Sequence, residues 1–216
     1  LPLFIVSLFN LDNKVILRVS GKINFSFLRK INFIYASKKI VKILVQTNES
    51  RKRLVLSNLF EKNKIKILRD PIIDFKKINC LKKKKIKNSF RKNRYFISIG
   101  RLTKQKNFLF LLKCIKEIII KEKRFKFLIL GEGNERYKLE QFIKKNKLSN
   151  FVHILGFKKN IYNYIENSFG LISTSLWEEP GFVIQEASAC KKIVLCSDCY
   201  TGPSEFLDHG KIGYVF

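Results

Sequence analysis

Two short segments of this sequence combine charges in a way that suits a phosphate and a sugar. The first begins at Gly100 and reads GRLTKQK, so that Arg101 and Lys106 directly follow an apolar run. Arginine offers a rigid fork of N–H donors and lysine a compact charge, and the two together suit a diphosphate. The second, WEEPGFVIQE from Trp177, carries three carboxylates in a chain with 44 Lys and Arg against 17 Asp and Glu.

The second segment also predicts the start of a helix. Its Pro-Gly turn, which ends at Gly181, leaves the backbone N–H groups of Phe182 and Val183 at a helix N-terminus, a place that favours an anion. Glu178 precedes this helix, and Glu186 lies about two turns further on. The two carboxylates can therefore reach different parts of one ligand.

Apolar runs that alternate with helical patterns position both segments. Leu111, Leu112, Ile115 and Ile119 share one face of a predicted helix, and GEG at 131–133 predicts a tight turn. Strands are predicted at 95–100, 125–130, 151–156, 169–175 and 192–197. This alternation predicts a doubly wound α/β domain, which binds its ligands beyond the carboxyl ends of its strands.

The earlier part of the chain predicts a second region of the same class. We expect a strand from Lys14, a helix over Phe27–Lys39, a strand over Ile43–Thr47, a helix over 48–60 capped by Asn48 or Thr47, and a strand over 64–68. The apolar opening, 1–9, is interpreted as a buried strand. We divide the chain into an N-terminal domain at 1–73, a basic and solvated linker at 74–94, and a C-terminal domain at 95–216.

The composition limits the classes of protein to be considered. A hydrophobic content of 46% supports a real core and excludes global disorder. The formal charge of +27 has two interpretations, attraction to phosphate or a general abundance of lysine. The five cysteines indicate reduced thiols; a zinc site built from Cys190, Cys196, Cys199 and His209 is the alternative. The absence of Met and the apolar ending GYVF suggest a fragment.

Four segments, in this order and at these spacings, carry a family resemblance. GRLTKQKN, LILGEGNER, VHILGF and WEEPGFVIQEA resemble the nucleotide-sugar domain of family 4 glycosyltransferases, which have the GT-B fold. The ending SDCYTGPSEFLDHGKIGYVF is similar to the closing stretch of that family. The resemblance covers Tyr95 to Phe216; residues 1–73 resemble, more loosely, the later part of the acceptor-side domain. The form EEPGF resembles enzymes of bacterial surface-polysaccharide assembly.

The resemblance implies a retaining transferase of the hexosyltransferase type, without a bound metal or other cofactor. It would move a sugar from a nucleotide-diphosphate donor to a glycan or lipid-linked acceptor, in polysaccharide or lipopolysaccharide assembly. Three residues would be catalytic: Arg101 and Lys106 would hold the diphosphate, and Glu178 would bind hydroxyls of the donor sugar. The resemblance assigns donor binding to Gly100, Gly181, Phe182, Val183 and Glu186, and Glu186 would bind the ribose hydroxyls.

Two departures from the family pattern bear on this expectation. Glu179 and a proline stand before Gly181 where the family more often has glycine directly after the first glutamate, and Glu179 receives no role. The family's glycine-rich acceptor loop and catalytic-region histidine have no counterpart here, since His153 and His209 fall in the donor domain. The chain alone is therefore expected to bind donor weakly and to transfer little.

The basic charge also bears on where the protein is located and on which other functions have to be considered. We expect a cytoplasmic protein that is peripheral at the inner face of the cell membrane, because each Lys or Arg near anionic lipid adds about 1 kcal/mol. One rival is a basic nucleic-acid-binding module, suggested by the charge and by KKKK at 82–85, although no nucleic-acid partner is expected. Another is a phosphorylase or a different nucleotide-sugar enzyme of the same architecture.

Overall fold

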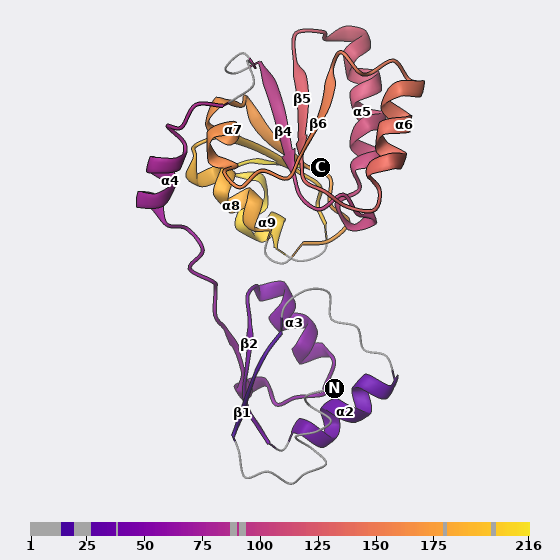
Figure 1. Cartoon of the computed structure of the whole chain (residues 1–216). Coiled ribbons are helices and arrows are strands. Elements are labelled where there is room, and N and C mark those ends of the chain that lie inside the picture. Colours follow the sequence, from indigo (N-terminus) through magenta and orange to yellow (C-terminus); the bar gives the residue numbers. More distant parts are fainter. Residues whose placement is uncertain are drawn as a thin grey trace. The chain divides into compact units, whose positions relative to one another are not determined.

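The computed structural model describes residues 14–19, 27–37, 39–86, 90, 94–178, 181–199 and 202–216. The predicted strand at 1–9 and the residue Glu179 lie outside these ranges. The chain divides into two compact units (Figure 1): the first is Leu1–Asp70 with Glu178–Pro180, and the second is Pro71–Trp177 with Gly181–Phe216. Within the described ranges, none of the helices has the length and apolarity needed to cross a membrane.

The first unit has a parallel sheet of three described strands in the order β1-β2-β3. Its elements are β1 (Val15–Arg18), α2 (Phe27–Ser37), β2 (Ile40–Val45), α3 (Asn48–Leu56), η1 (Lys62–Lys64) and β3 (Ile65–Ile67). Thr47 caps α3 as predicted, since its side chain accepts a hydrogen bond from the Ser50 N–H. The helix ends earlier than predicted because Asn58 adopts a left-handed φ of 53°.

The basic segment after Asp70 differs from the solvated linker expected at 74–94. It contains helix α4 (Phe75–Leu81), which begins where the Asp74 carboxylate accepts the Lys77 N–H at 3.0 Å. Ile78 is 2% exposed and belongs to the core of the second unit, and Ile86 and Phe90 pack against the same core. The many lysines of this segment concealed the spacing of its apolar residues, which anchor it to the second unit.

The second unit contains six described strands, all paired in parallel, in the order β6-β5-β4-β7-β8-β9. Its elements beyond α4 are β4 (Tyr95–Ile99), η2 (Lys104–Lys106), α5 (Phe108–Lys121), β5 (Lys126–Leu130), α6 (Arg136–Lys145), β6 (Val152–Gly156), α7 (Tyr162–Asn167), β7 (Gly170–Ser173), α8 (Phe182–Ala189), β8 (Ile193–Cys196), α9 (Pro203–Phe206), η3 (Asp208–Gly210) and β9 (Tyr214–Val215). The five strands predicted in this part of the sequence are all present.

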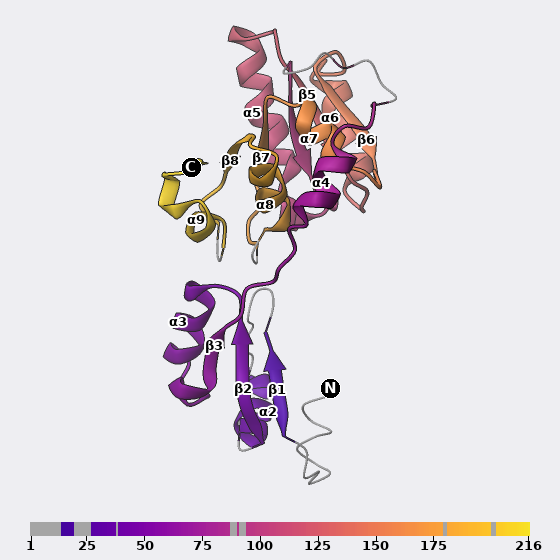
Figure 2. The ribbon, with the colours of Figure 1, turned by 90° about the vertical axis from the view of Figure 1, so that its left-hand side faces the viewer.

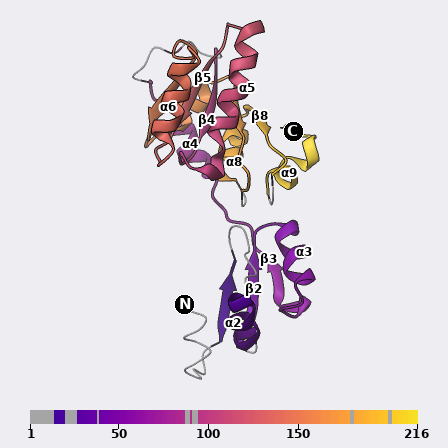
Figure 3. The ribbon, with the colours of Figure 1, turned by 90° about the vertical axis from the view of Figure 1, so that its right-hand side faces the viewer.

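Helices cover both faces of this sheet. Figure 2 looks onto the side with α4, α7 and α8, and Figure 3 onto the opposite side, with α5 and α6. The core is split accordingly, because neighbouring residues of a strand face opposite ways. Phe127 and Ile129 join the cluster under α5 and α6, whereas Leu128 and Leu130 join the cluster under α7 and α8. Parallel sheets of this kind confirm the predicted Rossmann-like α/β class.

Candidate functional site

The order of the strands places the two predicted segments together. From β4 the chain runs outward through β5 and β6, then returns to β7 on the other side of β4 and continues through β8 to β9. The reversal falls between β4 and β7, and a doubly wound sheet binds ligands at such a switch point, beyond the carboxyl ends of the strands. Arg101 and Lys106 follow β4, and the segment from Trp177 follows β7.

Hydrogen bonds join the loop after β4 to the loop after β7. The Leu176 N–H donates to the Gln105 carbonyl at 2.8 Å, and the Gln105 amide donates to the Trp177 carbonyl at 3.0 Å. The Thr174 hydroxyl, which is almost completely buried, lies 3.1 Å from the Lys106 carbonyl and 3.2 Å from that of Asn107. The basic loop is therefore held directly against the loop that leads to the carboxylates.

Gly100 leaves the space that the Lys106 side chain occupies. A Cβ at Gly100 would lie 2.9 Å from Lys106 Cε and 3.0 Å from Cδ, so the lysine stem passes directly over this glycine. At Gly131, which has a φ of 144°, a Cβ would lie 1.9 Å from the Gly100 carbonyl oxygen. The predicted tight turn at 131–133 thus packs backbone to backbone against the end of β4.

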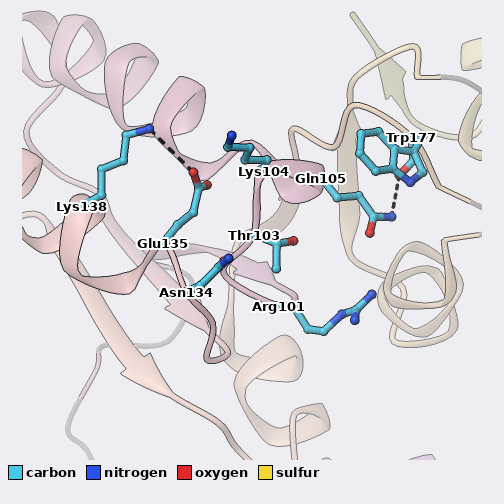
Figure 4. Close-up of a pocket in the computed structure, with 8 residues that line it drawn as sticks. All are labelled: Arg101, Thr103, Lys104, Gln105, Asn134, Glu135, Lys138 and Trp177. Atoms are coloured by element: carbon cyan, nitrogen blue, oxygen red, sulfur yellow. Dashed lines mark hydrogen bonds and ion pairs between the residues drawn. The ribbon is translucent and has the colours of Figure 1, made fainter.

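Arg101 contributes to a pocket that Lys106 does not line. It is exposed and lines a pocket of about 580 Å³ (Figure 4), together with Thr103, Lys104, Gln105, Asn134, Glu135, Lys138 and Trp177. Lys106 is not among these lining residues. Of the two cations that the sequence assigns to one diphosphate site, Arg101 thus lines this pocket, whereas the Lys106 side chain lies against Gly100.

The predicted helix start after Gly181 is present. Gly181 has a left-handed conformation with a φ of 83°, and α8 begins at Phe182. The Ile184 N–H donates to the Gly181 carbonyl, while the N–H groups of the first turn of a helix have no acceptor within the helix. Ile184 and Ala187 are buried in the core and hold α8 against the sheet, so the N-terminus of α8, a kind of place that favours an anion, is held in position.

Glu186 lies on α8 in a partly buried place, where it has a partner that the sequence did not reveal. The Tyr162 hydroxyl donates to Oε1 of Glu186 at 2.8 Å. Burial raises the pKa of Glu186, and the hydrogen bond from Tyr162 opposes that rise. Burial also raises the pKa of the Tyr162 phenol, which therefore remains a donor at neutral pH. No motif marks Tyr162, because the contact exists only once α7 packs on α8.

Glu178 is assigned to a different unit from the other candidate residues. It follows Trp177 and is 8% exposed, but it falls in the short segment that is counted with the first unit. Arg101, Lys106, Gly181 and Glu186 all belong to the second unit. The role of Glu178 on the donor sugar thus stays a prediction.

The alternative of a zinc site receives no support from the geometry. Among the described residues, no three or more His, Cys, Asp or Glu side chains converge as metal ligands. Cys190 and Cys196 form no disulfide bond and are buried in the core. Burial raises the pKa of Cys190 to about 11, so that the thiol stays protonated at neutral pH. Cys190 and Cys196 are packing residues.

Comparison with known proteins identifies the class to which this fold and these loops belong. Residues 81–216 match the family described as "Glycosyl transferases group 1". This match spans more than half of the chain and contains Arg101, Lys106, Gly181 and Glu186. The chain belongs to this family of glycosyltransferases, and the parallel sheets of its two units resemble those of GT-B structures.

Particular relatives sharpen this assignment. An uncharacterised glycosyltransferase of Methanocaldococcus jannaschii is 36% identical over 171 residues, which are 76% of this chain and 41% of the relative. The N-acetylgalactosamine-N,N'-diacetylbacillosaminyl-diphospho-undecaprenol 4-alpha-N-acetylgalactosaminyltransferase of Campylobacter jejuni is 31% identical over 124 residues, 57% of this chain and 33% of the relative. The chain thus spans about a third to two fifths of these relatives.

Solved structures agree with the fold. HepE of Anabaena, crystallised with UDP, matches 99% of this chain and 62% of its own with a TM-score of 0.81 at 18% identity. TarM of Staphylococcus aureus, crystallised with UDP among other ligands, matches 93% of this chain and 40% of its own with a TM-score of 0.75 at 22% identity. At such identities the likeness concerns the fold.

Proposed function

We propose that this chain carries the donor-binding part of a glycosyltransferase that uses a nucleotide-diphosphate sugar and retains the configuration of the transferred sugar. One observation carries the proposal: the loop after β4, with Arg101 and Lys106, is hydrogen-bonded at the switch point of the sheet to the loop that leads into α8. In this proposal the two cations, the N-terminus of α8 and the Glu186 carboxylate would contact one donor molecule at this edge of the sheet.

The proposed roles follow from where charge develops in the reaction. Breaking the bond between sugar and diphosphate leaves negative charge on the diphosphate, and cations that are already in place stabilise it. Arg101 and Lys106 would hold the diphosphate from two sides, and the N-terminus of α8 at Gly181 would add backbone N–H donors. Glu186 would accept hydrogen bonds from the ribose hydroxyls, and Glu178 from those of the sugar.

The relatives favour acceptors of the cell surface. The name of the Campylobacter enzyme includes a diphospho-undecaprenol acceptor, and other relatives are named for amylovoran biosynthesis in Erwinia amylovora and for the lipopolysaccharide core in Rhizobium meliloti. We therefore propose transfer to a glycan or lipid-linked acceptor, without a bound metal, in the cytoplasm at the inner face of the membrane. The basic surface would there face anionic lipid.

Calorimetric titration with UDP, GDP and ADP, and with their sugars, tests the donor site directly. One nucleotide is expected to bind the parent chain more tightly than the others. Arg101→Ala and Glu186→Ala should each weaken this binding by about tenfold, because each removes a hydrogen bond to a charged group. Glu117→Ala, at an exposed position on α5, is the matched control and should bind as the parent does. Undiminished binding by both site variants would overturn the assignment.

A further inference from the structure

The pocket beside Arg101 contains groups that the donor site does not use. Of its eight lining residues, Arg101 alone is among those assigned to the donor; Lys106, Gly181 and Glu186 do not line it. Its volume of about 580 Å³ falls within the range of about 300–1,000 Å³ that is usual for small-molecule sites. Figure 4 shows the lining side chains coming from the loop after β4, from the start of α6 and from Trp177.

The charges of this pocket are not balanced. Lys138 lies 3.7 Å from a carboxylate oxygen of Glu135, so these two side chains pair with each other. Within the part of the chain that the structure describes, the side chains of Arg101 and Lys104 have no hydrogen-bond or ion-pair partner. With three cations and one carboxylate, the lining carries a net charge of +2. The pocket therefore favours an anionic ligand.

The remaining lining groups suit a sugar. Trp177 places a large aromatic ring on one wall, and its backbone carbonyl is held by the Gln105 amide at 3.0 Å. An aromatic ring offers a flat apolar surface to the C–H face of a pyranose. The Thr103 hydroxyl and the Asn134 amide also line the pocket and can both donate and accept hydrogen bonds. The pocket thus combines an aromatic wall, neutral polar groups and two unpaired cations. This combination favours a polyol that carries negative charge.

We infer that this pocket is an acceptor subsite for a sugar bearing an acidic substituent, either a phosphate monoester or a carboxylate. The inference rests on the proposed function, because the acceptor hydroxyl has to meet the donor sugar next to the diphosphate. Arg101 lines the pocket and is also assigned to the donor diphosphate, so the acceptor subsite adjoins the donor site at this residue. When Arg101 holds the diphosphate, Lys104 is the unpaired cation left to bind the acidic group of the acceptor.

The test is a titration of the 216-residue chain with three probes: glucose 6-phosphate, glucuronic acid and uncharged methyl glucoside. Each titration is run without UDP and at saturating UDP. At least one of the two acids should bind with and without UDP, and the comparison between them distinguishes phosphate from carboxylate. Methyl glucoside should bind at least about tenfold more weakly, since it lacks the hydrogen bonds to a charged group.

Variants assign the binding to this pocket. Lys104→Ala should weaken the preferred acid by about tenfold, whereas Lys113→Ala, at an exposed position on α5, should leave it unchanged. Melting curves establish that both variants are folded. Displacement of both acids by UDP, equal binding of methyl glucoside, or no effect of Lys104→Ala would each overturn the inference. If UDP binding depends on Glu186 but neither acid binds, the acceptor subsite is wrong and the donor proposal stands.

Discussion

The Tyr162 hydroxyl donates a 2.8 Å hydrogen bond to Oε1 of Glu186, and so ties α7 to the carboxylate proposed to bind ribose. Among the described residues, Tyr162 is the one hydrogen-bond partner of this carboxylate. The phenol therefore orients Glu186 and also favours its charged form against the effect of burial. Under the proposed function Tyr162 is a positioning residue, since it would act on the ligand through Glu186.

Removing the Tyr162 hydroxyl should change the pH dependence of nucleotide binding. Burial raises the pKa of Glu186, and Tyr162→Phe removes the hydrogen bond that lowers it, so the pKa should rise further. Because the charged carboxylate is the stronger acceptor, UDP affinity should fall as the pH is lowered, and the midpoint of that fall should move to higher pH in the variant. Titrations from about pH 8 to about pH 4 measure this midpoint. Tyr137→Phe, at an exposed tyrosine, should keep the midpoint of the parent chain.

Neutralising Glu186 should increase stability while it weakens binding. A carboxyl group whose folded pKa is raised destabilises the folded state once the pH exceeds its unfolded pKa, because the buried charge is then disfavoured. Glu186→Gln should therefore raise the melting temperature at neutral pH, and this gain should shrink as the pH falls and Glu186 becomes protonated. Melting curves at several pH values, read beside UDP titrations, check both effects. A lower melting temperature at neutral pH would contradict this account.

The Thr174 hydroxyl should contribute to the position of Lys106. Thr174→Val removes a buried hydroxyl whose acceptors are the carbonyls of Lys106 and Asn107, and should lower the free energy of unfolding by about 1–3 kcal/mol. The loop after β4 would also lose a tie to the loop after β7, so UDP affinity should fall. Thr174→Ser keeps the hydroxyl and should retain most of the binding. Equal UDP affinities in the two variants would show that the hydroxyl is not needed to position the loop.

Alanine at the two neighbouring glycines should have contrasting effects. At Gly100 the new methyl group would meet the flexible end of Lys106, which can move, so Gly100→Ala should fold but bind UDP more weakly. At Gly131 it would meet the backbone of Gly100 at a φ that suits glycine, so Gly131→Ala should lose more than about 2 kcal/mol of unfolding free energy. Chemical denaturation separates the two cases, and equal losses of stability would contradict them.

The sequence predicted five of the strands of the second unit and the helices α5 and α8, because buried parallel strands and amphipathic helices leave clear periodic patterns. It did not predict the contacts between loops. Leu176 and Gln105, like Tyr162 and Glu186, meet only through packing of segments that are distant in the chain. Nor did the sequence indicate that Arg101 lines a pocket to which Lys106 does not contribute, because spacing along a loop does not indicate where each side chain lies.

The segment around α4 was misinterpreted because charge dominates its composition. Its lysines suggested a solvated connection, yet Ile78 is almost completely buried and Ile86 and Phe90 are partly so. The ring of Phe90 lies 5.9 Å from that of Tyr95 and 5.5 Å from that of His153, measured between ring centroids. A few well-spaced apolar side chains were sufficient to join this basic segment to the core.

The backbone contact between Gly131 and the Gly100 carbonyl restricts how the specificity of this site could change during evolution or by design. Neither glycine can be varied without moving Lys106 or straining the turn, so the proposed diphosphate end of the site is fixed in shape. Thr103, Lys104, Asn134 and Trp177 line the adjoining pocket and lie outside that contact. A library that randomises these four positions would therefore change the proposed acceptor subsite while leaving the proposed contacts to the donor diphosphate in place.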